Sequence, residues 1–174
     1  MAQLGAREHY APARAAAKAG RLNRLYTDVW ASANTPIGRK LSSLVPRLGS
    51  RWHPELADAT VRTLGLGVAW ASNRRTPSET IPEMYSHFEQ VGGIFSRAVA
   101  KQLHAQAKQR DSLGPDGFFS FTTTALEALK AARELSMTTV VSQIDPARIE
   151  DALVAQEAEK WPGWETRPGA VPQS

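Results

Sequence analysis

The sequence predicts an α/β fold: a three-layer, Rossmann-like sandwich built on a mostly parallel sheet of about five strands. Short β-branched or aromatic runs alternate with helical patterns along the chain. The clearest unit is residues 117–146, where an aromatic run (118–121) precedes apolar residues at helical spacing and a second β-branched run (137–141). This order is a βαβ unit, so its strands are expected to be parallel and joined by a right-handed crossover.

The remaining elements follow in order. A first strand is expected at 2–7, followed by a helix opened by Pro12 and stopped by Gly20. A second strand is expected from Leu22 to near Thr27-Asp28, so the chain also starts with a βαβ unit. Prolines preceded by capping residues predict further helix starts. The later predicted elements are helices at 36–44 and 54–63, a strand at 64–70, a helix from about 80 to 108, and a helix at 146–161. The default strand order for this class is 3-2-1-4-5.

Composition bounds the class of protein. The chain has 174 residues, of which 42% are apolar, which suits one domain with a proper core. We assign residues 1–161 to that domain and the proline-rich residues 162–174 to a linker or disordered tail. Cysteine is absent, which excludes disulfides, zinc–thiolate sites and cysteine nucleophiles. The sequence shows no signal peptide and no apolar run of transmembrane length, so a cytoplasmic location is expected.

Charge is unevenly spread, although the net charge is only +4. Residues 36–75 carry seven basic and two acidic side chains, a net of +5, whereas residues 145–166 carry two basic and six acidic ones, a net of −4. The basic segment suits an anionic lipid surface at the inner face of a membrane, a nucleotide or an acidic acceptor. A solvated basic surface without a partner is the competing interpretation.

Parallel sheets bind ligands beyond the carboxyl ends of their strands, and this edge carries the predicted site. Arg7, His9 and Tyr10 follow the first predicted strand, with Arg7 and His9 as hydrogen-bonding groups and Tyr10 as a stacking group. Asp28 follows the second strand, where an acid can hold a ribose or simply cap a turn. Thr122 and Gln143 follow the last two strands.

Arg51 belongs to the basic segment with Arg47 and His53, a cluster able to grip a phosphate. Glu150 and Glu157 lie seven residues apart on one predicted helix, a spacing that suits acid/base work or, more simply, a solvated face. His87 and His104 lack a second ligand one helical turn away, so no metal site is predicted.

Familiar catalytic and nucleotide motifs are missing from the sequence. It contains no G-x-G-x-x-G after the first strand, no G-x-x-x-x-G-K-[ST], and no Ser-His-Asp arrangement. A self-contained dinucleotide or nucleoside-triphosphate domain is therefore disfavoured. A nucleic-acid partner is not expected, because aromatic and basic residues are not interleaved and no recognition motif is present.

Several short runs together resemble one family, the bacterial group 1 (family 4) glycosyltransferases. The resemblance covers residues 5 to 164. It is carried by Arg7 to Ala15 with Gly20-Arg-Leu and Tyr26 to Trp30, by Phe118 to Phe121 with Ala125 to Ala128, and by Thr138 to Pro146 with Glu150 and Glu157 to Trp164.

The resemblance implies the GT-B architecture, in which two Rossmann-like domains face a cleft. It also implies transfer of a sugar from a nucleotide-sugar donor with retention and without an essential metal or other cofactor. On this resemblance the chain looks like the N-terminal, acceptor-binding domain, because the basic residues and the E-x7-E-type carboxylate motif of the donor-binding domain are not present. The glycine-rich turn of many relatives is replaced by Arg7 to Pro12.

On this interpretation the chain alone is expected to be inactive. It is expected to bind a sugar or glycolipid acceptor and to work with a separate donor-binding domain. The candidate acceptor-binding residues are Arg7, His9, Tyr10, Asp28, Arg51, Thr122 and Gln143. A non-catalytic α/β binding or interaction module remains the alternative, and whether the chain is an enzyme stays open at this point.

Overall fold

The computed structural model describes residues 1–36, 38, 40, 43, 45, 48–73, 81–108, 116–143 and 148–163. Its α-helices are α1 (Ala11–Lys18), α3 (Leu66–Asn73), α4 (Ile81–Ala107), α5 (Leu126–Glu134) and α6 (Arg148–Lys160). Short 3₁₀ turns occur at η1 (Arg7–Tyr10), η3 (Pro54–Leu56) and η4 (Thr122–Thr124). The strands are β1 (Leu25–Thr27), β2 (Val61–Thr63), β3 (Gly117–Phe121) and β4 (Thr138–Ser142).

The predicted α/β class with parallel strands is confirmed, but the described strands form two sheets of two strands rather than one sheet of five. β1 pairs with β2 in parallel, and β3 pairs with β4 in parallel with Phe121 opposite Ser142. The βαβ unit predicted at 117–146 is present as β3, η4, α5 and β4.

Residues 1–3 run between the two strand pairs. The amide of Ala2 donates to the Phe119 carbonyl (2.9 Å), and the amide of Gln3 donates to the Tyr26 carbonyl (3.0 Å). The predicted first strand at 2–7 is thus reduced to one parallel bridge, Ala2 with Tyr26. The reason lies at Gly5, whose φ of +74° turns the chain out of the extended path.

The prediction for residues 54–70 was wrong in detail. The strand lies at 61–63, where a helix was expected, and the apolar run at 64–70 begins the helix α3 instead of a strand. A short apolar run fits a buried helix as well as a buried strand, so its periodicity does not decide between them. Gly65, at φ +92°, makes the turn between β2 and α3.

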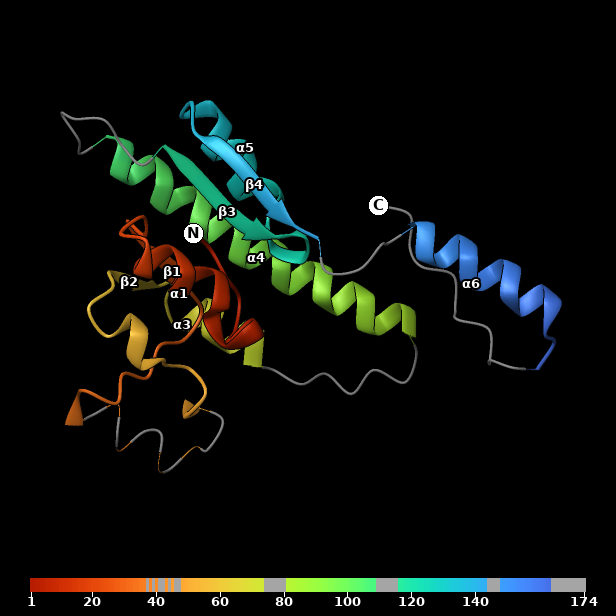
Figure 1. The fold of residues 1–174 in the computed structure, drawn as a ribbon, viewed down its shortest axis with the longest axis horizontal. Coiled ribbons are helices and arrows are strands. Elements are labelled where there is room, and N and C mark those ends of the chain that lie inside the picture. The colour runs from red at the N-terminus through yellow and green to blue at the C-terminus, as the bar shows by residue number, and fades with distance from the viewer. Residues whose placement is uncertain are drawn as a thin grey trace.

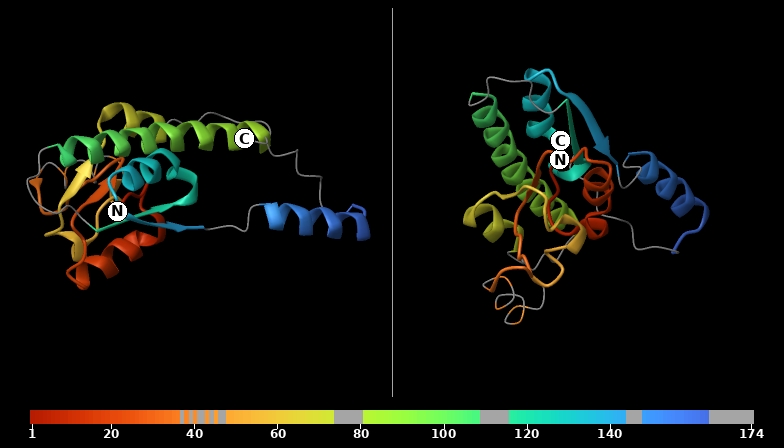
Figure 2. Two further views of the ribbon diagram at one scale, coloured as in Figure 1. Left: turned by 90° about the horizontal axis from the view of Figure 1, so that it is seen from above. Right: turned by 60° about the vertical axis from the view of Figure 1, so that its left-hand side comes forward.

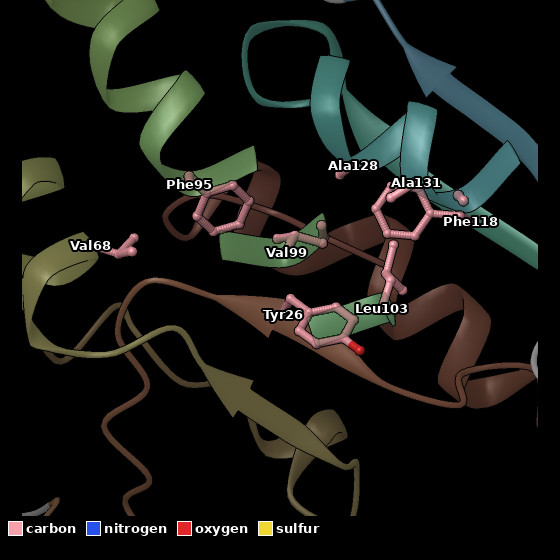
Figure 3. Close-up of a cluster of buried hydrophobic side chains, with 10 residues drawn as sticks. Tyr26, Val68, Phe95, Val99, Leu103, Phe118, Ala128 and Ala131 are labelled. Atoms are coloured by element: carbon pink, nitrogen blue, oxygen red, sulfur yellow. The ribbon is translucent and has the colours of Figure 1, made fainter. Parts of the chain in front are cut away.

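Helices lie on both faces of the strands (Figures 1 and 2). On one face, Phe95, Val99 and Leu103 of α4 pack with Tyr26 and Phe118 of the strands, and Val68 of α3 and the alanines of α5 complete this cluster (Figure 3). On the other face, Ala13 of α1 packs with Leu25, Leu56 and Tyr10. Leu25 and Tyr26 are neighbours in β1 and point to opposite faces, as a strand requires.

Two residues of α4, Gly92 and Ser96, determine how α5 packs against this helix. A Cβ at Gly92 would lie 2.0 Å from the Thr123 carbonyl oxygen, so only glycine allows η4 to approach α4 this closely. Four residues on, the buried Ser96 hydroxyl accepts from the Ala128 amide at 3.0 Å. This amide belongs to the first turn of α5, whose own N-cap residue Ala125 offers no side-chain acceptor.

Candidate functional site at the carboxyl edge of the strands

All predicted site residues except Arg51 follow three neighbouring stretches of strand: residues 1–3, β1, and the β3–β4 pair. Because parallel strands end at one edge, the loops after them meet there. Thr122 and Gln143 come directly after the paired residues Phe121 and Ser142, so both lie at this edge, and both are exposed.

Asp28 and Arg51 form the anchor of this edge. The Asp28 side chain is fully buried, and Arg51 Nη1 donates to both its carboxylate oxygens, at 2.9 and 3.1 Å. The Gly5 amide (3.0 Å) and the Thr27 hydroxyl (3.2 Å) also donate to Asp28 Oδ1. A buried carboxylate needs such partners, because removal from water without them costs several kcal/mol. The pair therefore fixes the loop after residues 1–3 onto the end of β1.

Arg7 extends over the end of β3. Its guanidinium carbon lies 5.5 Å from the centre of the Phe121 ring, a cation–π contact. Gln3 Nε2 donates to the Arg7 carbonyl at 2.6 Å and thereby holds the backbone of the turn. Two buried atoms here, Arg7 Nη1 and Gln3 Oε1, have no hydrogen-bond partner among the described residues. Buried donors and acceptors usually have partners, so these two atoms leave hydrogen-bonding capacity unused at this turn.

The turn that carries Arg7 has an unusual backbone. Glu8, His9 and Tyr10 are three successive non-glycine residues with φ between +48° and +60°. Left-handed backbone costs roughly 1–2 kcal/mol per residue for L-amino acids. Such strain persists only where the surroundings fix it, and it is found most often at functional sites. The turn exposes His9 and aims Tyr10 inward.

Tyr10 lies in the core rather than on the surface. It is fully buried and packs edge-to-face on Trp30, with ring centroids 5.4 Å apart. Its hydroxyl has no hydrogen-bond partner among the described residues. Burial raises the pKa of Tyr10 to about 12, and this effect outweighs the opposing effect of the Thr27 hydroxyl, which lowers the pKa. The predicted stacking on a ligand therefore has no exposed ring face to use in this structure.

Arg7, Asp28, Arg51, Thr122 and Gln143 thus gather at one edge, with His9 exposed on the adjoining turn. Sequence reasoning missed Gln3 and Gly5, which hold the turn together. The available signal was Gly5 itself, a glycine directly after the first extended residues. Arg47 lies outside the described residues, so the predicted cluster with Arg51 and His53 is not seen as a whole. His53 instead accepts from the Glu55 amide at the start of η3 (3.2 Å).

Other candidate sites are less developed. Within the described ranges, no group of three or more His, Asp or Glu side chains is placed to hold a metal ion. A hollow of about 610 Å³ lies between α3 and α4, lined by Val68, Ile94, Arg97 and Lys101 among others. Its described lining residues include no carboxylate, histidine or serine, and it lies on a helical layer rather than at the strand ends. Among the helices that the structure describes, none is long and apolar enough to cross a membrane.

Comparison of the chain with protein-family profiles, with curated proteins and with solved structures found no match.

Proposed function

We propose that this chain is the acceptor-binding half of a GT-B-type glycosyltransferase. Its site is the cluster at the carboxyl edge of the strands, formed by Arg7, Asp28, Arg51, Thr122 and Gln143. This cluster would bind an oxygen-rich, anionic acceptor such as a phosphorylated sugar. The proposal joins the residue-level resemblance to one observation: residues 1–3 run between β1 and β3, with Arg7 on the loop that follows. Residues 1–3 thus have the parallel pair β1–β2 on one side and the parallel pair β3–β4 on the other. This position corresponds to the point between two groups of strands where open α/β sheets bind ligands.

Arg7 is the residue best placed to meet such an acceptor. The Asp28 charge is already balanced by Arg51, so Asp28 does not compete for Arg7. A planar guanidinium held against Phe121 presents its donors in a fixed fork, the geometry that carboxylate and phosphate oxygens match. An acceptor oxygen would accept from the Arg7 guanidinium, while Thr122 and Gln143 would hydrogen-bond neighbouring hydroxyls.

The remaining polar residues act through the backbone. Asp28 and Arg51 hold Gly5 and with it the start of the strained turn. This rigidity matters because positioning an acceptor hydroxyl accounts for a large share of the rate in a transfer reaction. The nucleotide-sugar donor and the groups that stabilise its leaving phosphates would come from a separate domain. The described chain then orients the acceptor and excludes water, and we expect it to be inactive alone.

The test is titration calorimetry of the purified chain with neutral sugars and with sugar phosphates. We expect sugar phosphates to bind and Arg7→Ala to weaken binding by about tenfold or more, the usual effect of losing a charge-assisted hydrogen bond. Arg21→Ala is the matched control: Arg21 is exposed and precedes β1, at the opposite edge, so its loss should leave binding unchanged. Thermal unfolding of both variants confirms that they fold. Equal weakening by both variants, or no binding of any sugar, counts against the proposal.

A second function, that of a non-catalytic interaction module, is supported by the first half of α4. Tyr85 and Phe88 are 40% and 52% exposed, and no side chain described between 83 and 90 is buried. Fusion to a donor-binding domain from a related enzyme separates the two functions. Sugar transfer by the fusion supports the glycosyltransferase, whereas no transfer and no sugar binding favours the interaction module.

A further inference from the structure

The outer edge of β4 is open. Among the described residues β4 has one hydrogen-bonded neighbour, β3, so its other edge presents unpaired backbone amides and carbonyls. Exposed edges are usually protected by charges, prolines or bulges. Residues 137–143, Met-Thr-Thr-Val-Val-Ser-Gln, contain no charge and no proline. The edge thus lacks the usual protection against pairing with another strand.

Both faces of β4 are also incompletely covered. Val140 and Val141 are successive residues, so they point to opposite faces of the sheet, and they are 50% and 47% exposed. Leu126 at the start of α5 is 61% exposed. A solvated edge strand normally keeps apolar side chains on one face only.

The helix that follows β4 shows the same incomplete burial. α6 stands apart from the other elements in Figure 1 and in both views of Figure 2. Ile149 and Leu153, one turn apart on α6, are 69% and 56% exposed. A helix of this length is marginal in water without tertiary packing, so α6 needs a surface to pack on.

We propose that the β4 edge is the interface of a homodimer, in which β4 of two copies pair antiparallel across a twofold axis. A second copy fits because the strand is neutral and therefore meets its own image without charge repulsion. Twofold pairing is isologous, so the interface closes and leaves no edge for further growth. The β3–β4 sheets of the two copies then form one continuous four-stranded sheet.

The area that a stable dimer must bury and the charges near β4 indicate which other elements belong to the interface. A stable interface buries roughly 1,200–2,000 Å², more than a five-residue strand supplies, so Leu126 of α5 and the apolar residues of α6 must take part. α6 is acidic, with four acidic and two basic residues. Both acids of α5 already face α4, Glu127 at Arg97 (3.2 Å) and Glu134 at His104 (3.4 Å). Lys130 is exposed on α5, and Arg133 Nε donates to the Thr139 hydroxyl of β4 at 3.4 Å, so both positive charges lie on the β4 side and are opposite in sign to α6 of the partner copy.

The experiment is sedimentation equilibrium of the whole chain over a concentration series. We expect a species of twice the chain mass of 19.0 kDa. Val140 is the middle residue of β4, so Val140→Lys places two like charges close together at the axis and should raise the dimer dissociation constant by about tenfold or more. Phe88→Lys, at similar exposure on α4, is the matched control and should leave the dimer intact.

A mixing experiment tests the symmetry directly. Copies with Val140→Lys and copies with Val140→Glu should each be weakened as dimers, and an equal mixture should recover a dimer, because opposite charges then meet across the axis. A wild-type chain that stays monomeric at every concentration overturns the proposal. So does a dimer that Phe88→Lys disrupts and Val140→Lys leaves unchanged. Neither result depends on acceptor binding, so the dimer and the proposed function fail separately.

Discussion

Arg51 lies against Asp28, with Nη1 of the guanidinium 2.9 and 3.1 Å from the two oxygens of a carboxylate that is fully buried. The two residues are 23 positions apart, and Gly5 donates to the same carboxylate from a third segment. The pair thereby joins the loop after residues 1–3, the end of β1 and the basic segment, so it holds the candidate site together.

Arg51→Ala should lower the free energy of unfolding by about 2–4 kcal/mol, because the buried Asp28 carboxylate loses the cation that donates to both of its oxygens. Urea denaturation measures the loss. Arg62→Ala removes the same side chain from an exposed position on β2 and should change stability by less than about 0.5 kcal/mol.

The double variant with Asp28→Asn and Arg51→Ala provides an internal check. Asparagine still accepts from Gly5 but carries no charge, so the double variant should lose less than the sum of the two single losses. Strict additivity would show that the contact contributes nothing to stability beyond its separate parts.

The sequence predicted individual supersecondary units better than it predicted how these units pack together. Residues 117–142 fold as expected because aromatic, helical and β-branched runs there follow one another within a single unit. Residues 64–70 did not, because an apolar run of that length fits either a helix or a strand until its packing partner is known. For α3 that partner is α4, through Val68 and its neighbours.

The same holds for the candidate site, where single residues were predicted but their contacts were not. Asp28 and Arg51 were each predicted from the residue type and from their place in the chain, but their contact depends on the path of the loop between them. Tyr10 was expected on the surface, and the left-handed backbone at Glu8, His9 and Tyr10 turns it into the core. No sequence rule anticipates three such residues in succession, because each alone is unfavourable.

Gly92→Ala should destabilise the protein by about 2–4 kcal/mol, since the new Cβ would lie 2.0 Å from the Thr123 carbonyl oxygen and force α4 and η4 apart. Gly67→Ala is the matched control. Its Cβ would meet no atom within 4 Å, and alanine favours the helix, so stability should rise by about 0.5 kcal/mol. Thermal unfolding distinguishes the two, and equal midpoints for both variants would contradict the close approach.

Ser96→Ala should cost about 1–2 kcal/mol, because the buried amide of Ala128 loses its only side-chain acceptor at the start of α5. Ser86→Ala lies on the exposed half of the same helix and should be close to neutral. Hydrogen exchange locates the effect. The Ala128 amide and its neighbours in α5 should exchange faster in Ser96→Ala, while β1 and β2 keep their protection. Uniformly faster exchange would mean that the hydroxyl does not act as a cap.

Tyr10 makes the stability of the folded protein depend on pH in the alkaline range. Its pKa is raised from an ordinary 10 to about 12, chiefly by burial. The folded state therefore holds the proton more tightly than the unfolded state, and this contribution is complete below pH 10. It is lost as pH rises through about 12, and two pKa units correspond to about 2–3 kcal/mol.

Tyr10→Phe removes both the titration and a buried hydroxyl that has no hydrogen-bond partner among the described residues. At neutral pH the variant should be as stable as the parent or slightly more stable, because no hydrogen bond is lost and no polar group remains to be desolvated. Between pH 10 and 12 the parent should lose stability more steeply than the variant, as measured by urea denaturation at each pH. Tyr85→Phe, at a 40% exposed tyrosine, should follow the parent. If Tyr10→Phe instead costs more than about 1 kcal/mol at neutral pH, the hydroxyl has a partner, and the turn at Glu8 to Tyr10 is held by that bond rather than by packing on Trp30.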